Sequence, residues 1–360
     1  MVEDAGAVVA GGLGLWLEEV GPDRVIGVTG TKGKSTTTSL VGHLATRLGL
    51  RCFTGGNLGA VPWSPGAPSR VDLWAIEISS YQATDLWSSP KVMAVTSLHE
   101  DHLNWHGDAE RYYTDKLGAC GRTGAVMTVA NGADHRLRAR AELLKPGPFW
   151  VDPSAADSSW TKALKLRGRH NLTNALIAAA SLEQFGVDAA ADPVLLAEAA
   201  EGYQPLAHRL ETIATIAGVE YVDDSLSTNV LTTITAVDVF EDRQLALLVG
   251  GFERNIDYSP LAAVVAARKA PTLAFTLPDN GGHIGRSVIE AGGSAVHCSD
   301  IADAVQQAAV WARPGGVVLL SPAAASYGKF RNYAARGDAF RSAVNAIEVR
   351  RVIHPPRSLG

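Results

Sequence analysis

A glycine-rich loop between an apolar run and a helical pattern constrains this chain more than any other feature. The β-branched run at 24–29 is typical of a buried strand, and the pattern from Lys34 to about Leu48 is typical of a helix. Glycines let backbone N–H groups approach phosphate oxygens, a helix N-terminus favours negative charge, a lysine can reach the β- and γ-phosphates, and a serine hydroxyl can bind Mg²⁺. We therefore predict a nucleotide-binding α/β domain whose phosphate contacts are Gly30, Thr31, Lys32, Gly33, Lys34, Ser35 and Thr36.

The loop departs at one position from the common phosphate loop. The common form has a glycine five residues before Gly33, and this chain has Val28 there. The shorter pattern G-x-x-G-K-S matches in full. A plain glycine turn with a stray lysine is the competing interpretation. The strand before the loop and the hydroxyl run after it, Ser35–Thr38, argue against that interpretation.

Strand and helix patterns alternate along most of the chain, which predicts βαβ units and a mostly parallel sheet. We expect a central P-loop-type ATPase domain at 24–203. A Rossmann-like α/β domain at 204–349 follows, and it begins with a hairpin around Gly218. A short leader at 1–23 and a flexible tail at 350–360 complete the chain. The ligands of such sheets bind beyond the carboxyl ends of the strands.

Composition excludes several classes of function. Hydrophobic residues make up 46% of the 360 residues, which excludes a disordered chain. The formal net charge of −5 gives no field that would attract a nucleic acid or an anionic membrane. Three distant cysteines form no disulfide framework or zinc pattern and fit a reducing compartment. Because no targeting segment or membrane-length apolar run is present, we predict a cytoplasmic protein without nucleic-acid or membrane partners.

Further motifs follow the loop in a set order and carry a resemblance that covers about residues 25–345. Each motif alone is weak, but together they are specific. The chain resembles the Mur ligases, and among them the glutamate-adding members that act on UDP-N-acetylmuramoyl-L-alanine. The matching stretches are VTGTKGKSTTT (28–38), GGNLG (55–59), EISSYQ (77–82), HEDHLNWHG (99–107), DKL (115–117), GRHNLTNAL (168–176), HRLE (208–211), DDSLSTN (223–229), GGFERNIDY (250–258) and SPAAASYGKFRNYAARGDAF (321–340).

The resemblance implies an ATP-dependent amide ligase of peptidoglycan precursor synthesis. In such enzymes ATP phosphorylates a substrate carboxylate, and the amino group of glutamate then displaces phosphate from the acyl phosphate. The resemblance implies ATP and two Mg²⁺ ions as cofactors, UDP-N-acetylmuramoyl-L-alanine and glutamate as substrates, and a monomeric enzyme. Negative charge on phosphoryl oxygens at each step accounts for the many cationic and metal-binding residues.

Residues of the first domain take catalytic and metal-binding roles through this resemblance. Lys34 matches the lysine of the phosphate loop, and Ser35 matches a hydroxyl ligand of Mg²⁺. Glu77, at the end of a predicted strand, matches a Mg²⁺ ligand, with an exposed charge as the alternative. His102 matches the histidine of a second metal site. Lys116 matches a lysine that is carried as a carbamate and bound to the second Mg²⁺, whereas its own chemistry would suggest a solvated helix lysine.

The resemblance also assigns residues to the substrates. Asn171 and Asn174 lie three residues apart on one helix face and would meet the adenine and ribose of ATP, and one of them would also cap the helix. From the second domain, Arg209 would reach the phosphates of ATP and Asp224 its ribose. The residues expected near the reacting end of the substrate and around the incoming glutamate are Asn57, Thr228, Ser326 and Tyr333.

One departure from the family pattern bears on the isomer of glutamate. D-glutamate-adding members usually have DSKATN where this chain has DSLSTN at 224–229, so Leu226 replaces a lysine. Leucine cannot make the charge-assisted hydrogen bond to a carboxylate, worth roughly 1.5–3 kcal/mol, that a lysine offers. A subfamily that adds L-glutamate also lacks this lysine. We therefore favour L-glutamate and keep the D-glutamate-adding group as the alternative.

A second departure lies at the start of the chain. The family has a first domain that binds the uridine diphosphate part of the substrate, and only residues 1–23 precede the predicted first strand here. We expect this domain to be missing. Three explanations stay open, namely a truncated gene product, a start codon that was assigned too late, and a natural two-domain form of the enzyme. One alternative function is therefore a nucleotide-binding remnant without ligase activity. Another is a ligase like folylpolyglutamate synthase, against which the HRLE, DDSLSTN and SPAAASYGKF stretches argue.

Overall fold

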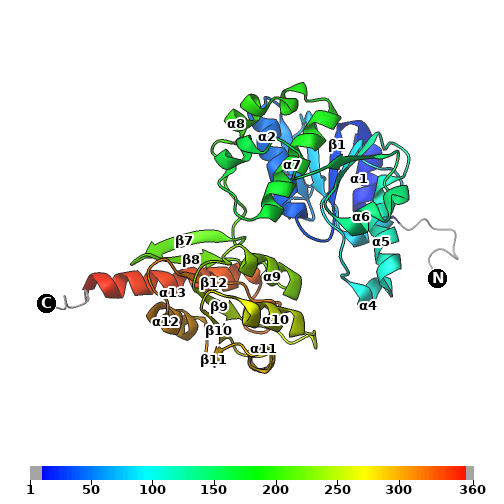
Figure 1. The fold of residues 1–360 in the computed structure, drawn as a ribbon. Helices are drawn as coiled ribbons and strands as arrows, with labels where there is room; N and C mark the ends of the chain where they lie inside the picture. The colour runs from blue at the N-terminus through cyan, green and yellow to red at the C-terminus, as the bar shows by residue number, and fades with distance from the viewer. Residues whose placement is uncertain (1–9, 354–360) are drawn as a thin grey trace. The chain divides into compact units, whose positions relative to one another are not determined.

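The computed structural model describes residues 10–353, with side chains as far as residue 347 (Figure 1). The described chain divides between Gln204 and Pro205 into two compact units, which we call unit 1 and unit 2. Each unit is built on its own six-stranded sheet. No helix in the described part of the chain is long and apolar enough to cross a membrane.

The sheet of unit 1 is parallel throughout, and its strand order is β2-β3-β1-β4-β5-β6. This confirms the predicted parallel α/β domain. The first strand lies in the middle of the sheet and is fully buried, as its apolar sequence requires. The strands are β1 (Val25–Thr29), β2 (Cys52–Gly56), β3 (Leu73–Glu77), β4 (Val92–Val95), β5 (Met127–Asn131) and β6 (Pro148–Val151).

Helices cover both faces of this sheet and create two apolar cores. The helices are α1 (Gly12–Val20), α2 (Lys34–Arg47), α3 (Ser80–Thr84), α4 (Leu103–His106), α5 (Ala109–Leu117), α6 (His135–Arg138), α7 (Arg169–Phe185) and α8 (Pro193–Ala200). Short 3₁₀ turns occur at Pro22–Arg24, Gly118–Cys120, Ala141–Leu143, Ser159–Leu164 and Asp188–Ala191. On one face α2 packs on β1, β2 and β3, and α7 packs on β4, β5 and β6.

The segment before β1 belongs to the fold of unit 1. Helix α1 places Leu13, Trp16 and Leu17 in the core on the second face of the sheet. The ring of Trp16 meets Trp74 of β3 edge to face, with 5.2 Å between the ring centroids. The described part of the predicted leader therefore contains a helix that packs into unit 1, and residues 1–9 lie outside the described residues.

The sheet of unit 2 has the order β11-β10-β9-β12-β8-β7, and only the β7–β8 pair is antiparallel. Ala217 and Gly218 both have positive φ and close the predicted hairpin between these two strands. The strands are β7 (Glu211–Ile216), β8 (Val219–Asp223), β9 (Leu245–Val249), β10 (Thr272–Thr276), β11 (Ala295–His297) and β12 (Val317–Leu320). The helices are α9 (Val230–Asp238), α10 (Ser259–Ala267), α11 (Gly281–Glu290), α12 (Ile301–Trp311) and α13 (Tyr333–Ile353).

Some elements differ from the sequence expectations. Strands β2 and β6 and helix α11 were not predicted, because β2 ends in two glycines, β6 begins with proline, and α11 contains three glycines. Helix α13 runs to Ile353, so residues 350–353 are helical and not part of a flexible tail. The rest of the predicted tail, 354–360, lies outside the described residues.

Candidate active site

The predicted phosphate loop connects the end of β1 to the first turn of α2. Gly30 and Gly33 have φ values of 132° and 89°, a conformation that other residues rarely adopt. A Cβ atom on Gly33 would also clash with the side-chain oxygen of Asn174. Gly33 is the N-cap residue of the 14-residue helix α2, and it has no side chain that could cap the backbone N–H groups of the first turn. The loop therefore has the form of an anion site at a helix N-terminus.

Side chains of the loop are tied to the neighbouring segments. Lys34 Nζ lies across the loop and donates to the carbonyl oxygens of Gly30 at 3.0 Å and Thr31 at 3.1 Å. Lys32 forms a salt bridge of 3.0 Å with Asp101, which the sequence did not predict. Thr36 is buried in the first turn of α2, and Ser35 before it is half-buried. Lys32 and Lys34 thus place two positive charges at the predicted phosphate loop.

Glu77 lies at the carboxyl end of β3, and it is only 2% exposed. Its Oε1 accepts a hydrogen bond of 2.9 Å from Asn57 Nδ2, and its backbone oxygen accepts one of 3.0 Å from Asn57 N. Its Oε2 is buried and has no hydrogen-bond partner among the described residues. Such an oxygen is costly unless it is paired, and Mg²⁺ prefers carboxylate oxygen ligands. This residue therefore fits the predicted metal role and not the exposed alternative.

His102 is the N-cap residue of the short helix α4 and has a left-handed conformation, with φ of 54°. Tyr81 and His102 share a hydrogen bond of 3.1 Å between Tyr81 Oη and His102 Nδ1. Burial lowers the pKa of His102, which favours the neutral imidazole that binds metals. The nearby His106 lies in the interior, where its two ring nitrogens are 2.8 Å from Asp115 and 3.0 Å from Ser80.

Lys116 is buried on α5, with 1% of its surface exposed, so the interpretation as a solvated lysine is wrong. Its Nζ donates to the backbone oxygen of Gly30 at 3.1 Å and lies 4.9 Å from the centre of the Tyr112 ring. Burial, together with the positive charge of Lys34, holds the pKa of Lys116 well below its usual value. A neutral amine is the form that reacts with carbon dioxide, so this environment suits a carbamate.

Tyr112 is a site residue that the sequence analysis missed. Its hydroxyl shares a hydrogen bond of 3.0 Å with Thr31 Oγ1, and Thr31 Oγ1 also donates to the backbone oxygen of His99 at 2.9 Å. Tyr112 thereby links α5 to the phosphate loop. The signal was present, because Tyr112 and Lys116 are four residues apart and share a helix face.

Asn171 and Asn174 are buried near the start of α7. Asn174 Nδ2 donates to Asn171 Oδ1 at 3.2 Å, and Asn171 Nδ2 donates to the backbone oxygen of Arg167 at 2.8 Å. The prediction that one of them caps the helix is wrong, because Gly168 stands at the cap position with φ of 84° and no side-chain bond. Asn174 instead lies against Gly33, which brings this pair beside the phosphate loop.

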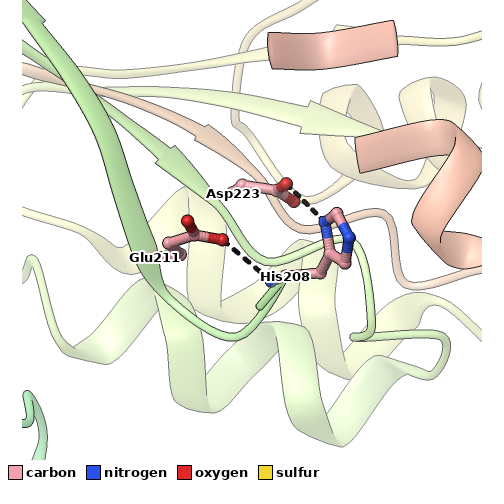
Figure 2. A group of neighbouring side chains, drawn as sticks. All are labelled: His208, Glu211 and Asp223. Carbon is pink, nitrogen blue, oxygen red and sulfur yellow. Dashed lines mark hydrogen bonds and ion pairs between the residues drawn. The ribbon is translucent and has the colours of Figure 1, made fainter. Parts of the chain in front are cut away.

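The HRLE stretch of unit 2 is held by a cluster of His208, Glu211 and Asp223 (Figure 2). His208 Nδ1 lies 2.7 Å from Asp223 Oδ2, and the backbone N–H of His208 donates to Glu211 Oε2 at 3.1 Å. The other oxygens are also bonded, Glu211 Oε1 to Arg341 at 2.8 Å and Asp223 Oδ1 to the backbone N–H of Ser225 at 2.9 Å. Because each of these carboxylate oxygens accepts a hydrogen bond, the cluster fixes the shape of the loop around Arg209.

Asp224 is buried directly after β8. Its Oδ1 accepts from the backbone N–H of Leu210 at 3.2 Å, and its Oδ2 accepts from Ser321 Oγ at 2.7 Å. Burial raises the pKa of Asp224 to about 7 in spite of these bonds and of the positive charge of Arg209. The carboxyl group therefore ties the HRLE loop to the end of β12, and the ribose contact stays a prediction.

The residues predicted for glutamate lie in the loops beyond the carboxyl ends of the unit 2 strands. Thr228 follows Leu226 in the loop after β8, and its backbone oxygen accepts a hydrogen bond of 2.7 Å from Arg254. Ser326 is buried in the loop after β12. Tyr333 begins α13 with 41% of its surface exposed, and its ring centre lies 6.0 Å from that of His208.

Comparison with protein families matches both units. The model described as "Mur ligase middle domain" matches residues 28–147, within unit 1. The model described as "Mur ligase, glutamate ligase domain" matches residues 208–324, within unit 2. The two matches include the phosphate loop and Lys116 in the first unit and the HRLE and DDSLSTN stretches in the second.

Several curated relatives carry the same name. The UDP-N-acetylmuramoyl-L-alanine–L-glutamate ligase of a Micromonospora species is 40% identical over 94% of this chain and 77% of its own length. The proteins of the same name from Salinispora tropica and Xanthomonas euvesicatoria are 38% and 37% identical, each over 93% of this chain, and over 77% and 76% of their own lengths. This chain thus spans about three quarters of the length of these relatives.

Solved structures share the fold at low sequence identity. MurF ligase of Thermotoga maritima, solved in complex with ADP, has a TM-score of 0.65 and 16% identity, and the match covers 90% of this chain and 80% of that one. UDP-N-acetylmuramate–alanine ligase of the same organism gives 0.64 and 18%, with 93% and 79% covered. Folylpolyglutamate synthase of Mycobacterium tuberculosis, complexed with ADP, gives 0.65 and 15%, with 91% and 92% covered.

Proposed function

Because the chain belongs to the Mur ligase family, we propose that it joins L-glutamate to UDP-N-acetylmuramoyl-L-alanine in an ATP-dependent step of peptidoglycan precursor synthesis. One observation of the structure carries the chemistry of this proposal. The phosphate loop after β1, Glu77 at the end of β3 and His102 after β4 follow neighbouring parallel strands at their carboxyl ends. Ligands of parallel sheets bind at this edge.

Residues of unit 1 support the activation of a carboxylate by ATP. The glycine loop and Lys34 would hold the β- and γ-phosphates and stabilise the charge that moves between their oxygens. Asn171 and Asn174, beside Gly33, would face the nucleoside. Asn57 would approach the reacting carboxylate of the substrate. Its side-chain amide and its backbone N–H both donate hydrogen bonds to Glu77, and these two bonds fix its position at the site.

Two Mg²⁺ ions fit the donors of unit 1. Glu77, whose Oε2 has no partner within the described residues, and Ser35 would hold the first ion, and His102 and Lys116 as a carbamate would hold the second. The bound ions would supply electrostatic stabilisation of the phosphoryl oxygens. The carbamate forms when the neutral amine of Lys116 attacks carbon dioxide and loses a proton, which converts a buried amine into an anion beside the loop.

Residues of unit 2 would contact ATP and bind the incoming glutamate. Arg209, on the loop shaped by the His208 cluster, would contact the ATP phosphates, and Asp224 the ribose. Ser326, Tyr333 and Thr228 would surround the glutamate. Leu226 offers no cation to a carboxylate, which supports L-glutamate over D-glutamate because the two isomers place their carboxylates differently around the attacking amine. We also place the enzyme in the cytoplasm as a monomer.

The test is product formation with each pure isomer of glutamate in parallel. UDP-N-acetylmuramoyl-L-alanine and ATP are supplied, and the amide product is measured by liquid chromatography and mass spectrometry. We expect kcat/KM for L-glutamate to exceed that for D-glutamate at least tenfold, which is about 1.4 kcal/mol. Lys34→Ala serves as the inactive control with unchanged thermal stability.

The other outcomes identify the alternatives. A preference for D-glutamate would place the chain in the main D-glutamate-adding group and refute the argument from Leu226. A wild-type chain that binds ATP but forms no amide with either isomer would be a nucleotide-binding remnant.

A further inference from the structure

His106 lies at the centre of a cluster that joins three segments of unit 1. It is the last residue of α4, and its side chain is fully buried. Its Nε2 lies 3.0 Å from Ser80 Oγ at the start of α3, and its Nδ1 lies 2.8 Å from Asp115 Oδ2 near the end of α5. Because an ionised carboxylate only accepts hydrogen bonds, Nδ1 donates to Asp115. One imidazole thereby connects α3, α4 and α5.

The polar groups of this cluster bond to one another and to α5. Asp115 Oδ1 forms a salt bridge of 2.9 Å with Arg111 Nε, one turn earlier on the same helix. Ser80 is only 2% exposed. A Ser–His–Asp arrangement serves as the catalytic triad of many hydrolases, in which the serine attacks the substrate. Because Ser80 is buried, the arrangement in this chain instead holds the three helices together.

Tyr81 connects His106 to His102. The ring of Tyr81 stacks on that of His106, with 5.8 Å between the ring centroids and 22° between the planes. Its hydroxyl shares the hydrogen bond of 3.1 Å with His102 Nδ1. Tyr81 also follows Ser80 directly in α3, so the cluster fixes its backbone as well as its ring. A shift of His106 would therefore change where His102 is held.

A second set of contacts leads from His106 to Lys116. Asp115 precedes Lys116 on α5, so its bond to His106 fixes this turn of the helix. The ring of Tyr112 meets that of His106 edge to face, with 5.1 Å between the ring centroids. The centre of the same Tyr112 ring lies 4.9 Å from Lys116 Nζ. His106 therefore contacts the supports of both residues that we assign to the second Mg²⁺.

We propose that His106 is a positioning residue that sets the separation of His102 and Lys116 and thereby the affinity of the second metal site. The inference rests on the function proposed above and deepens it. Metal ligands need groups behind them that hold them in place, and the loss of such a group typically weakens metal binding roughly 10–100-fold. His106 is such a group for two ligands at once, because α4 follows His102 and α5 carries Lys116.

The test replaces His106 with phenylalanine, which keeps an aromatic ring and removes both nitrogens. Mn²⁺ is the probe, and its binding to the full chain with a nonhydrolysable ATP analogue, in a buffer that contains bicarbonate, is measured by electron paramagnetic resonance. We expect the wild type to bind two ions, and Lys116→Ala identifies the second as the ion that it weakens. His106→Phe should raise the Kd of this second ion at least tenfold and leave the Kd of the first ion and of the nucleotide within twofold.

His43→Phe is the matched control. His43 is a half-buried imidazole of α2, and its ring meets that of Tyr203 edge to face at 5.2 Å between the ring centroids. This variant also replaces an imidazole that packs on a tyrosine, but outside the His106 cluster. It should bind both ions and the nucleotide as the wild type does.

The second ion separates positioning from a general role in stability, because a loosened fold would weaken both ions and the nucleotide together. Second-ion binding by His106→Phe within twofold of the wild type would overturn the proposal. If His106→Phe loses the nucleotide as well, Ser80→Ala decides, because it removes one bond of His106 and leaves Asp115 in place. A loss of at least threefold for the second ion alone supports the proposal, and an unchanged or a uniformly weakened set of affinities overturns it.

The binding measurement does not depend on product formation, so the two proposals fail in different ways. Amide formation from L-glutamate is assayed in parallel, and we expect kcat of His106→Phe to fall at least tenfold while KM for ATP stays within twofold. A wild type that binds two ions but forms no product refutes the ligase function, and the Mn²⁺ affinities still decide on His106. A wild type that binds only one ion with the nucleotide analogue overturns the role of His106.

Discussion

The buried carboxyl group of Asp224 makes the stability of unit 2 depend on pH. Its pKa rises from 3.8 in the unfolded chain to about 7 in the folded protein because of burial. Between these values the unfolded chain releases a proton that the folded chain keeps, so the folded state loses stability as pH rises. A difference of about three pKa units corresponds to about 4 kcal/mol, of which about 2 kcal/mol falls between pH 5 and pH 7.

The variant Asp224→Asn removes this titration and preserves the shape of the side chain. We expect the variant to gain about 2 kcal/mol of stability relative to the wild type between pH 5 and pH 7, and the difference to level off above pH 8. Other titrating groups are common to both proteins and cancel in the difference. At any one pH, the difference in the free energy of unfolding between the variant and the wild type also includes the effect of the changed hydrogen bonds to Leu210 and Ser321. The quantity that tests the argument is therefore the change of this difference with pH.

Urea unfolding at pH 5, 6, 7 and 8 measures this effect. The transition of unit 2 is followed by pulsed hydrogen exchange and mass spectrometry of its own peptides, so that unit 1 does not contribute. Asp238→Asn, at an exposed aspartate of α9, is the matched control. Its difference from the wild type in the free energy of unfolding should not change with pH. A flat difference for Asp224→Asn as well, or one that falls with pH, would refute the argument that burial controls the charge of Asp224.

Two further predictions follow from the sites. Lys116→Ala should abolish product formation, and added short-chain carboxylates that occupy the vacated site should partly restore it; full activity without them would remove Lys116 from the mechanism. Gly337→Ala should destabilise unit 2 by about 1–3 kcal/mol in thermal or urea unfolding, because a Cβ there would overlap the His208 ring and lie 2.6 Å from Asp223 Oδ2. Gly282→Ala, at a helix position with open space, is its control and should unfold no more easily than the wild type.

The sequence predicted those parts of the fold that depend on local pattern. The buried strand and the helix around the glycine loop appear as β1 and α2, since apolar periodicity and glycine positions are local signals. Strand β6 was missed because Pro148 disfavours a strand, and its position at the sheet edge leaves the absent N–H without cost. Helix α11 was missed because its glycines disfavour a helix, although Gly281 packs directly against Thr276.

The candidate site, like the fold, could be predicted from the sequence only in part. Motif resemblance located Glu77 and Lys116, but only the structure shows that one carboxylate oxygen has no partner among the described residues and that the amine is buried. Arg336 stood within a recognised motif and was not singled out, because arginine is rarely buried and nothing in its neighbours signals burial. The capping role assigned to an asparagine of α7 failed because Gly168 turns the chain into the helix without a side chain.

The order of elements in unit 1 has a consequence for synthesis on the ribosome. Strands β4, β5 and β6 are complete by Val151, yet the helix that covers one of their faces, α7, begins only at Arg169 and ends at Phe185. At roughly 5–20 residues per second, the apolar side chains of Val92, Ala94 and Val129 wait several seconds for their cover. We therefore expect the nascent chain to bind chaperones during this interval, and we expect a chain that ends before α7 to leave one face of the sheet uncovered and to aggregate.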